Sequence, residues 1–247
     1  MSFLERMDQG IRRSAVWRSL FRQPYPNDER SRAYAVMNNV FLHLHPVRVR
    51  QHAVKFAYTF CLGGLSFFLF LVLTITGVYL MFFYVPSPGS AYTNIQTIQT
   101  EVAFGQYVRN VHRWSAHLMV LAVAAHMAKV FYRGAYKAPR EFNWVIGVIL
   151  LLLTLLMSFT GYLLPWDQLA FWAVTVGTEM AGYAPFIGGE VQGVLMGGET
   201  VGSATLLRFY VLHVAVLPTS LIFVLMIHLW RWRKDAMFDQ QAEDADE

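Results

Sequence analysis

Long apolar stretches alternate with charged stretches along the chain, and four of them are long enough to cross a membrane. A membrane-spanning helix needs about 20 mostly apolar residues. The four predicted spans are residues 56–84, 111–132, 144–166 and 209–230. The second is the weakest candidate for a membrane span, because Arg113 and Lys129 lie inside it. It is kept because basic and non-basic loops alternate only if the chain crosses the membrane there. The pattern therefore predicts an all-α membrane protein built on a bundle of four transmembrane helices.

Lys and Arg collect at alternate ends of these spans. Loops that stay on the cytoplasmic side of a membrane are enriched in these residues. Seventeen of the 20 basic residues lie before the first span, around the connection from the second to the third, or after the fourth. Residues 84–108 and 162–207 contain none. We therefore expect both termini on the cytoplasmic side.

The composition agrees with a membrane protein and excludes several other classes. Charged residues make up 15% of the chain and hydrophobic residues 55%, whereas soluble domains carry about 25% charged residues. The net charge of +4 is too small to indicate a nucleic-acid partner and reflects the topology instead. One cysteine excludes a disulfide framework and a Cys-rich zinc site.

The chain outside the spans divides into further segments. The predicted domains are a cytoplasmic extension (1–55), a four-helix domain (56–234) and an acidic, disordered tail (235–247). In the extension, residues 2–22 predict an amphipathic helix that lies on the membrane surface or, equally well, docks on a partner protein. In the long loop before the last span, we expect short helices at 167–180 and 190–196.

Two of the spans carry histidines at steps that return to one helix face. His112 and His126 are 14 residues apart, which places them within about 40° and roughly 21 Å of each other. His213 and His228 are 15 residues apart, within about 60°. The two spans run in the same direction, so His112 pairs in depth with His213 near the outer side. His126 pairs in the same way with His228 near the inner side.

Paired histidines at two depths favour one kind of site. A single histidine in a membrane helix often only bonds a neighbouring helix, and a zinc site needs three or four clustered ligands. Two levels, each with one histidine from each of two helices, are what axial ligation of two stacked haems requires. His117 lies on another face of its helix and is interpreted as a packing or surface residue.

The glycines repeat the histidine spacing on the two spans that lack histidine. Gly63 and Gly77 are 14 residues apart, and so are Gly147 and Gly161. Glycine in a membrane helix often only permits close helix packing, but here it also leaves room for a macrocycle edge at each level. Cations for the haem propionates are expected at Arg109, Arg113 and Lys129. Snorkelling to the membrane interface is the alternative role, and it suffices for Lys129.

Four stretches carry a resemblance to a known family. They are residues 61–77, 104–137 (FGQYVRNVHRWSAHLMVLAVAAHMAKVFYRGAYK), 139–178 (PREFNWVIGVILLLLTLLMSFTGYLLPWDQLAFWAVTVGT) and 205–228. Over about residues 56–234 the chain resembles the cytochrome b family, and within it the b6-type split cytochrome b subunit of cytochrome bc/b6f complexes. The 15-residue step from His213 to His228 is the b6-type spacing.

The resemblance implies particular roles for individual residues. His112 and His213 would ligate an outer haem b, and His126 and His228 an inner one. Cys61, in the motif F-C-L-G-G, would hold a third haem, a haem c, by one thioether bond. Arg109 and Arg113 match the family's R-x-x-H-R motif, and Arg233 matches the arginine near the inner haem. Four residues match this chain's share of an outer quinol site, although aromatic side chains there also suit an interface belt: Tyr162, Pro165, Trp166 and Trp172.

The implied function is that of the haem-bearing subunit of a quinol:cytochrome c (or plastocyanin-type) oxidoreductase that translocates protons. The expected partners are a Rieske iron–sulfur protein, a c-type cytochrome and a subunit IV-like chain with the P-E-W-Y part of the quinol site, in a dimeric complex. The expected location is a bacterial inner membrane or a thylakoid-type membrane. A di-haem anchor that links a dehydrogenase or hydrogenase to the quinone pool is the main alternative. A scaffold without cofactor is disfavoured, because intramembrane histidines are costly.

Overall fold

The computed structural model describes residues 28–38 and 60–244, with side chains up to Arg233 in the second range and up to Ala33 in the first. The amphipathic helix expected at residues 2–22 and the start of the first predicted span lie outside these residues. Contacts divide the chain into two units, one with residues 28–38 and the chain from Leu229 onward, and the other with residues 60–228.

The first unit contains the short helix α3 (Glu29–Asn38). Its start is stabilised by reciprocal hydrogen bonds, in which the Ser31 amide donates to Asp28 Oδ1 at 2.6 Å and the Asp28 amide donates to Ser31 Oγ at 3.3 Å. The bond from the Ser31 amide also holds the pKa of the Asp28 carboxyl below its ordinary value, because it favours the charged form.

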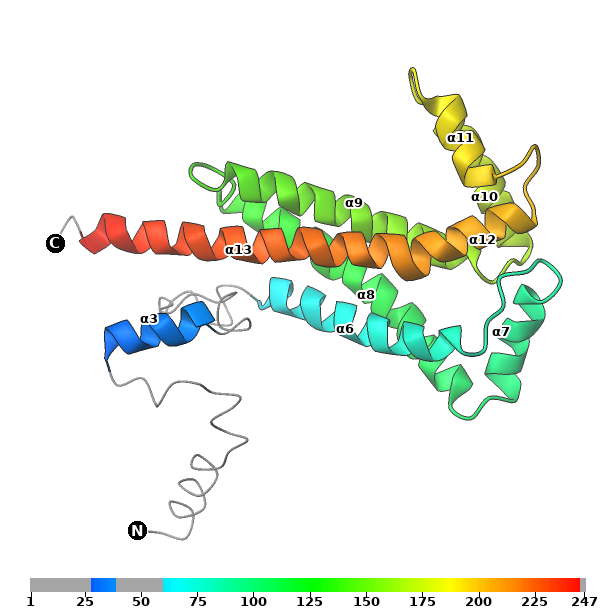
Figure 1. The fold of residues 1–247 in the computed structure, drawn as a ribbon, viewed down its shortest axis with the longest axis horizontal. Helices are drawn as coiled ribbons and strands as arrows, with labels where there is room; N and C mark the ends of the chain where they lie inside the picture. The colour runs from blue at the N-terminus through cyan, green and yellow to red at the C-terminus, as the bar shows by residue number, and fades with distance from the viewer. Residues whose placement is uncertain (1–27, 39–59, 245–247) are drawn as a thin grey trace, which may run out of the picture. The chain divides into compact units, whose positions relative to one another are not determined.

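In the part of the chain that the structure describes, four helices are long and apolar enough to cross a membrane (Figure 1). They are α6 (Leu62–Met81), α8 (Gly105–Tyr132), α9 (Glu141–Leu163), and the continuous run of α12 (Ser203–Val211), η1 (Leu212–Val216) and α13 (Leu217–Asp244). Large apolar side chains such as Phe68, Ile75 and Leu121 are exposed on these helices, as lipid-facing residues are. The prediction of an all-α protein with four spans is confirmed, and the described residues contain no strand.

The ends of the helices differ from the predicted spans by several residues. α8 begins at Gly105 rather than at residue 111, and the last span begins at Ser203 rather than at residue 209. The apolar pattern marks the part of a helix that hydrocarbon covers, whereas the hydrogen-bonded helix continues into the polar interface. The helical backbone of α13 also extends to Asp244, into the range where acidic composition predicts disorder. Extending a formed helix is easier than nucleating a new one.

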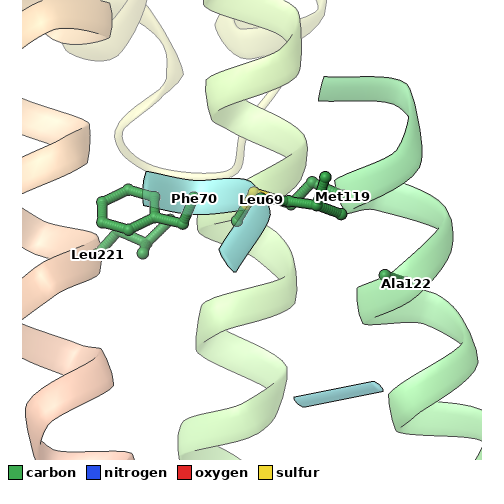
Figure 2. Packing of buried hydrophobic residues seen from close by; sticks show 5 residues of the cluster. All are labelled: Leu69, Phe70, Met119, Ala122 and Leu221. Carbon is green, nitrogen blue, oxygen red and sulfur yellow. The ribbon is translucent and has the colours of Figure 1, made fainter. Parts of the chain in front are cut away.

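The long helices pack around a shared apolar core. α8 packs against α6 on one side and α9 on the other, and α9 packs against α12 and η1. Figure 2 shows the buried centre of this core, in which side chains from three helices meet: Leu69, Phe70, Met119, Ala122 and Leu221. Leu150, Leu153 and Met157 of α9 pack against it. All four spans therefore contribute to one core.

Short helices fill the connections at one end of the bundle. α10 (Gln168–Gly182) and α11 (Gly188–Met196) confirm the two helices expected in the long loop, and Asp167 caps α10 by accepting the Ala170 amide at 2.8 Å. α7 (Ala91–Thr100), between α6 and α8, was not predicted. The loop from α7 to α8 is tight, because a Cβ on Gly105 would overlap the backbone carbonyl oxygen of Ile98.

We predict that Gly105→Ala lowers the free energy of unfolding by about 1–3 kcal/mol, because the backbone of α7 must move to admit the methyl group. Gly193→Ala is the matched control, since nothing lies within 4 Å of a Cβ added there and alanine favours the helix. Thermal unfolding of the purified protein in detergent measures both. Equal melting temperatures for the two variants would contradict the close approach at Gly105.

Candidate functional site

His112 and His213 face each other across the bundle. His112 lies on α8 and His213 lies in η1, and their ring centres are 6.3 Å apart with the ring planes at 73°. Both side chains are partly buried. The structure therefore brings together the two residues that the sequence places at one depth.

His126 and His228 form the second level. His126 lies four turns further along α8, and His228 lies on α13. These two side chains are also partly buried. We refer to the two sets as the His112 level and the His126 level.

Each of the four histidines packs against one of the four repeated glycines. A Cβ on Gly77 would lie 3.3 Å from His112 Cε1, and one on Gly161 would lie 2.6 Å from His213 Cε1. At the His126 level, a Cβ on Gly63 would lie 3.5 Å from His126 Cε1, and one on Gly147 would lie 3.8 Å from His228 Cε1. The glycines of α6 thus pack against the histidines of α8, and those of α9 pack against the histidines of the last span.

The five-residue π-helix η1 accounts for the unequal histidine spacings. In η1 the Leu217 amide donates to the carbonyl of Leu212, five residues back, instead of four. A π turn takes up one residue more than an α turn, so the 15-residue step to His228 rotates the helix about as far as the 14-residue step on α8. Pro218 lies directly after this turn, and its nitrogen has no hydrogen to donate to the turn before it.

The apolar core separates the two levels. Phe70 lies halfway along α6 between Gly63 and Gly77, and Met119 lies midway between His112 and His126 on α8. On the last span, Leu221 lies between His213 and His228. The core is therefore a layer of side chains between two sites rather than a wall around one site.

Two threonines that the sequence analysis did not single out contact the histidines of the His112 level. Thr76 Oγ1 lies 2.8 Å from His112 Nδ1, and Thr160 Oγ1 lies 3.1 Å from His213 Nδ1. Each threonine directly precedes one of the repeated glycines, at Thr76–Gly77 and Thr160–Gly161. This repeated Thr-Gly pair is the signal that could have identified them.

The expected cations lie near the histidine levels but differ in their contacts. Arg109 is one helical turn before His112 and donates from Nη1 to Gln99 Oε1 at 2.9 Å, whereas Arg113 is exposed. The Lys129 ammonium lies 4.5 Å from the ring centre of Phe60, three residues beyond His126 in sequence. Arg233 is on α13, in the other unit of the chain.

Cys61 lies at the start of α6 with its side chain exposed. Its φ of 49° and that of 47° at Phe60 are both left-handed, which is uncommon for residues other than glycine. Gly63, which packs on His126, follows two residues later. The only cysteine of the chain is therefore near the His126 level, on the helix opposite that histidine.

The residues matched to a quinol site gather where α9 turns into α10. Tyr162 and Trp172 are exposed, and Pro165 and Trp166 are partly buried. Trp166 has a left-handed φ of 51°, and its ring lies 6.1 Å from that of Phe171. The sharp turn at Trp166 therefore lets α10 leave the bundle with aromatic side chains on its exposed face.

A tyrosine pair that the sequence analysis did not identify supports this turn. The Tyr84 hydroxyl donates to the carbonyl of Leu164 at 2.6 Å, and its ring stacks on Tyr210 with the ring centres 5.6 Å apart. Burial, together with Tyr210, raises the pKa of Tyr84 above its ordinary value. The hydroxyl therefore remains a hydrogen-bond donor at physiological pH.

The geometry of the His112 level fits a metal held between two imidazoles. A metal–nitrogen bond of about 2.0 Å and a further ~1.1 Å to the ring centre, counted on both sides, would separate the ring centres by about 6.2 Å. The observed 6.3 Å agrees with this value. In the described part of the chain, no three His, Cys, Asp or Glu side chains converge on one point. The arrangement is thus suited to pairwise axial ligation rather than to a clustered metal site.

Comparisons with known proteins point to one family. The chain is 46% identical to the cytochrome b6 of Heliomicrobium gestii over 180 residues, which is 73% of this chain and 84% of that protein. It is 38% identical to the menaquinol:cytochrome c reductase cytochrome b subunit of Bacillus subtilis (strain 168) over 211 residues, covering 85% and 94% of the two chains. Among solved structures, a chain of a hyperthermophilic respiratory complex III has a TM-score of 0.66 at 31% identity. That match covers 71% of this chain and 47% of the other, so this chain spans about half its length.

A family model described as cytochrome b/b6/petB matches residues 48–236. The matched range includes both histidine levels, all four glycines that pack against them, Cys61 and the turn at Trp166. By this match, and by its four membrane-spanning helices, the chain is an integral membrane protein that belongs to the cytochrome b/b6 family.

Proposed function

We propose that this chain is the haem-bearing subunit of a quinol:cytochrome c (or plastocyanin-type) oxidoreductase. In such a complex, two b haems and a covalent haem c carry electrons one at a time across the membrane from an outer quinol site to an inner quinone site, coupled to proton translocation. The observation that carries the proposal is the pair of histidine levels, each flanked by two glycines. Relatives named cytochrome b6 and menaquinol:cytochrome c reductase cytochrome b subunit support it.

The four histidines would hold the two b haems as axial ligands. At the His112 level, one ring comes from α8 and the other from η1, so both are carried by hydrogen-bonded helix backbone rather than by loops. Gly77 and Gly161 leave the flanks of this level without side chains. Rigid helices with bare flanks position the rings and leave room for the edges of a flat macrocycle.

Basic side chains would pair with the haem propionates. Arg109 and Arg113 lie within one turn of His112, and Arg is the better bidentate partner for a carboxylate. Lys129 and Arg233 would serve the His126 level in the same way. These cations would compensate the negative charge of the haem propionates in a medium of low dielectric constant.

Cys61 would attach the haem c by a single thioether bond, formed when its thiol adds across a vinyl group. Its exposed side chain and its position two residues before Gly63 support attachment beside the His126 level. The left-handed turn at Phe60 and Cys61 would hold the sulfur at the edge of the bundle rather than inside it.

The outer quinol site would be shared with other chains. Tyr162, Pro165, Trp166 and Trp172 would supply this chain's part, and a subunit IV-like chain would carry the P-E-W-Y part. A Rieske protein and a c-type cytochrome would accept electrons in a dimeric complex. The distribution of Lys and Arg supports cytoplasmic termini in a bacterial inner membrane or a thylakoid-type membrane.

The proposed haem content predicts that the purified complex gives two low-spin b-type signals in reduced-minus-oxidised spectra. His213→Leu and His228→Leu should each abolish one of them, because each variant removes one of the two axial ligands of a single level. His117→Leu is the control that should keep both, since His117 is exposed and its ring lies against that of Trp114. A wild-type complex without two b haems, or one that purifies without a Rieske protein, contradicts the proposed function.

The glycine contacts predict a ranking of variants. Gly161→Ala should abolish or strongly reduce one b-haem signal and cost about 1–3 kcal/mol of stability, because its Cβ would lie 2.6 Å from His213 Cε1. Gly147→Ala should be milder, since its nearest contacts are 3.4 Å to Met127 Sδ and 3.8 Å to His228 Cε1. Haem absorbance per mole of protein measures both, and a more damaging Gly147→Ala would refute the ranking.

The proposed thioether predicts a haem-stained band near 28.3 kDa on a denaturing gel. Cys61→Ser should remove the band, because serine cannot form the bond, while the two b-haem signals persist in the native spectrum. Since serine has nearly the shape of cysteine, loss of the band with intact b haems isolates the covalent link. A band that survives the substitution rules out attachment through Cys61.

A further inference from the structure

The two threonine–histidine contacts at the His112 level repeat one arrangement on opposite sides of the bundle. Thr76 lies on α6 and contacts the ring of α8, while Thr160 lies on α9 and contacts the ring of η1. In each case the hydroxyl approaches Nδ1, with donor–acceptor separations of 2.8 Å and 3.1 Å. The glycine that follows each threonine packs against the same ring. Each histidine of this level is thus contacted by a Thr-Gly pair on a neighbouring helix.

The second contact of each threonine hydroxyl shows which group carries the proton between the hydroxyl and Nδ1. Thr76 Oγ1 lies 2.6 Å from the carbonyl oxygen of Val72, and Thr160 Oγ1 lies 2.9 Å from that of Leu156. A carbonyl oxygen only accepts, so the hydroxyl proton lies in that bond. The hydroxyl oxygen is then the acceptor towards Nδ1, and the proton between them belongs to the imidazole. Both rings are therefore Nδ1–H tautomers with a lone pair left on Nε2.

Backbone groups favour the same tautomer. The backbone of Leu73 is a further hydrogen-bond partner for His112, and the backbone of Met157 is one for His213. A carbonyl acceptor also requires a proton on the ring nitrogen. Each Nδ1–H of the His112 level is thus held by the backbone and, in addition, by a threonine hydroxyl.

The His126 level lacks the threonines. Leu62 and Ile146 stand where Thr76 and Thr160 stand, directly before Gly63 and Gly147, and neither has a hydroxyl. The backbone of Asn143 is a partner for His228, as the backbones of Leu73 and Met157 are for His112 and His213. The two levels therefore share their histidines and glycines but differ in the threonine hydroxyls that contact the histidines of the His112 level.

We propose that Thr76 and Thr160 are positioning residues that hold His112 and His213 as Nδ1–H tautomers and make them stronger electron donors than the histidines of the His126 level. The proposal rests on the proposed function, in which all four histidines ligate haem iron. A hydrogen bond from the distal ring nitrogen orients a metal-ligating histidine and raises its basicity. A more basic ligand stabilises the oxidised metal, so these bonds lower the reduction potential at the His112 level alone.

The test is a redox titration of the b haems in the purified complex from Thr76→Val, Thr160→Val and double-variant strains. Valine keeps the branched shape and removes the acceptor. We expect the midpoint potential of one b haem to rise, with the ratio of reduced to oxidised haem at a given ambient potential increasing about three- to tenfold, which is about 30–60 mV for one electron. The other b haem should not shift. Thr76→Ser and Thr160→Ser should restore the wild-type value.

Two threonines on the same helices provide matched controls. Thr74 of α6 and Thr154 of α9 make the same bond to the carbonyl four residues back, at 2.8 Å each. Valine at these positions should leave both potentials unchanged. Unchanged potentials in the double variant, an equal shift of both haems, or the same shift in the controls would overturn the proposal.

The experiment separates this proposal from the proposed function. If two b haems are present and their midpoint potentials do not change when Thr76 and Thr160 are replaced, the positioning role is refuted and the proposed function stands. A wild-type complex without two b haems refutes both. If the double variant loses a haem, the single variants decide the outcome, because each retains one threonine. The midpoint potentials of their b haems are then compared with those of the wild type. The low-spin signal of each haem in the paramagnetic resonance spectrum reports independently whether the ligand field of one level alone has changed.

Discussion

The arrangement of the four spans depends on how closely α6 and α9 approach the histidine rings carried by α8 and the last span. At Gly161, a single methyl group would come within 2.6 Å of His213, and at Gly77 within 3.3 Å of His112. Van der Waals packing is the main attraction between helices in lipid, because lipid tails are as apolar as the helices themselves. The glycines therefore let α6 approach the rings carried by α8, and let α9 approach the rings carried by the last span.

The same constraint repeats because the helices repeat. Fourteen residues are nearly four turns of an α-helix, so one close approach at Gly63 recurs at Gly77 on the same face. Between the two approaches, the bundle can fill with ordinary side chains, and it does so around Phe70 and Met119 (Figure 2). Two polar levels with a dry layer between them then follow from helix geometry. A low-dielectric layer also keeps water away from the histidines on both sides.

The two levels are similar in geometry and different in chemistry. Hydroxyl groups reach Nδ1 at the His112 level, whereas apolar side chains hold the corresponding positions at the His126 level. The cations differ as well, with Arg109 bonded to Gln99 at one level and Lys129 over the ring of Phe60 at the other. A bundle with a nearly repeated backbone can thus provide two unlike environments, because the neighbours of each ligand vary independently of the ligand itself.

The sequence by itself determined the four spans, the two histidine levels and the glycines opposite them, because hydrophobic length and helical periodicity are local properties of the chain. It did not reveal α7, a short helix of mostly polar residues, nor the π turn at Leu212–Val216. Only the tertiary structure decided how a 15-residue step matches a 14-residue one, and which hydroxyl meets which ring. Those features depend on contacts between helices far apart in sequence, and no local pattern encodes the distance between them.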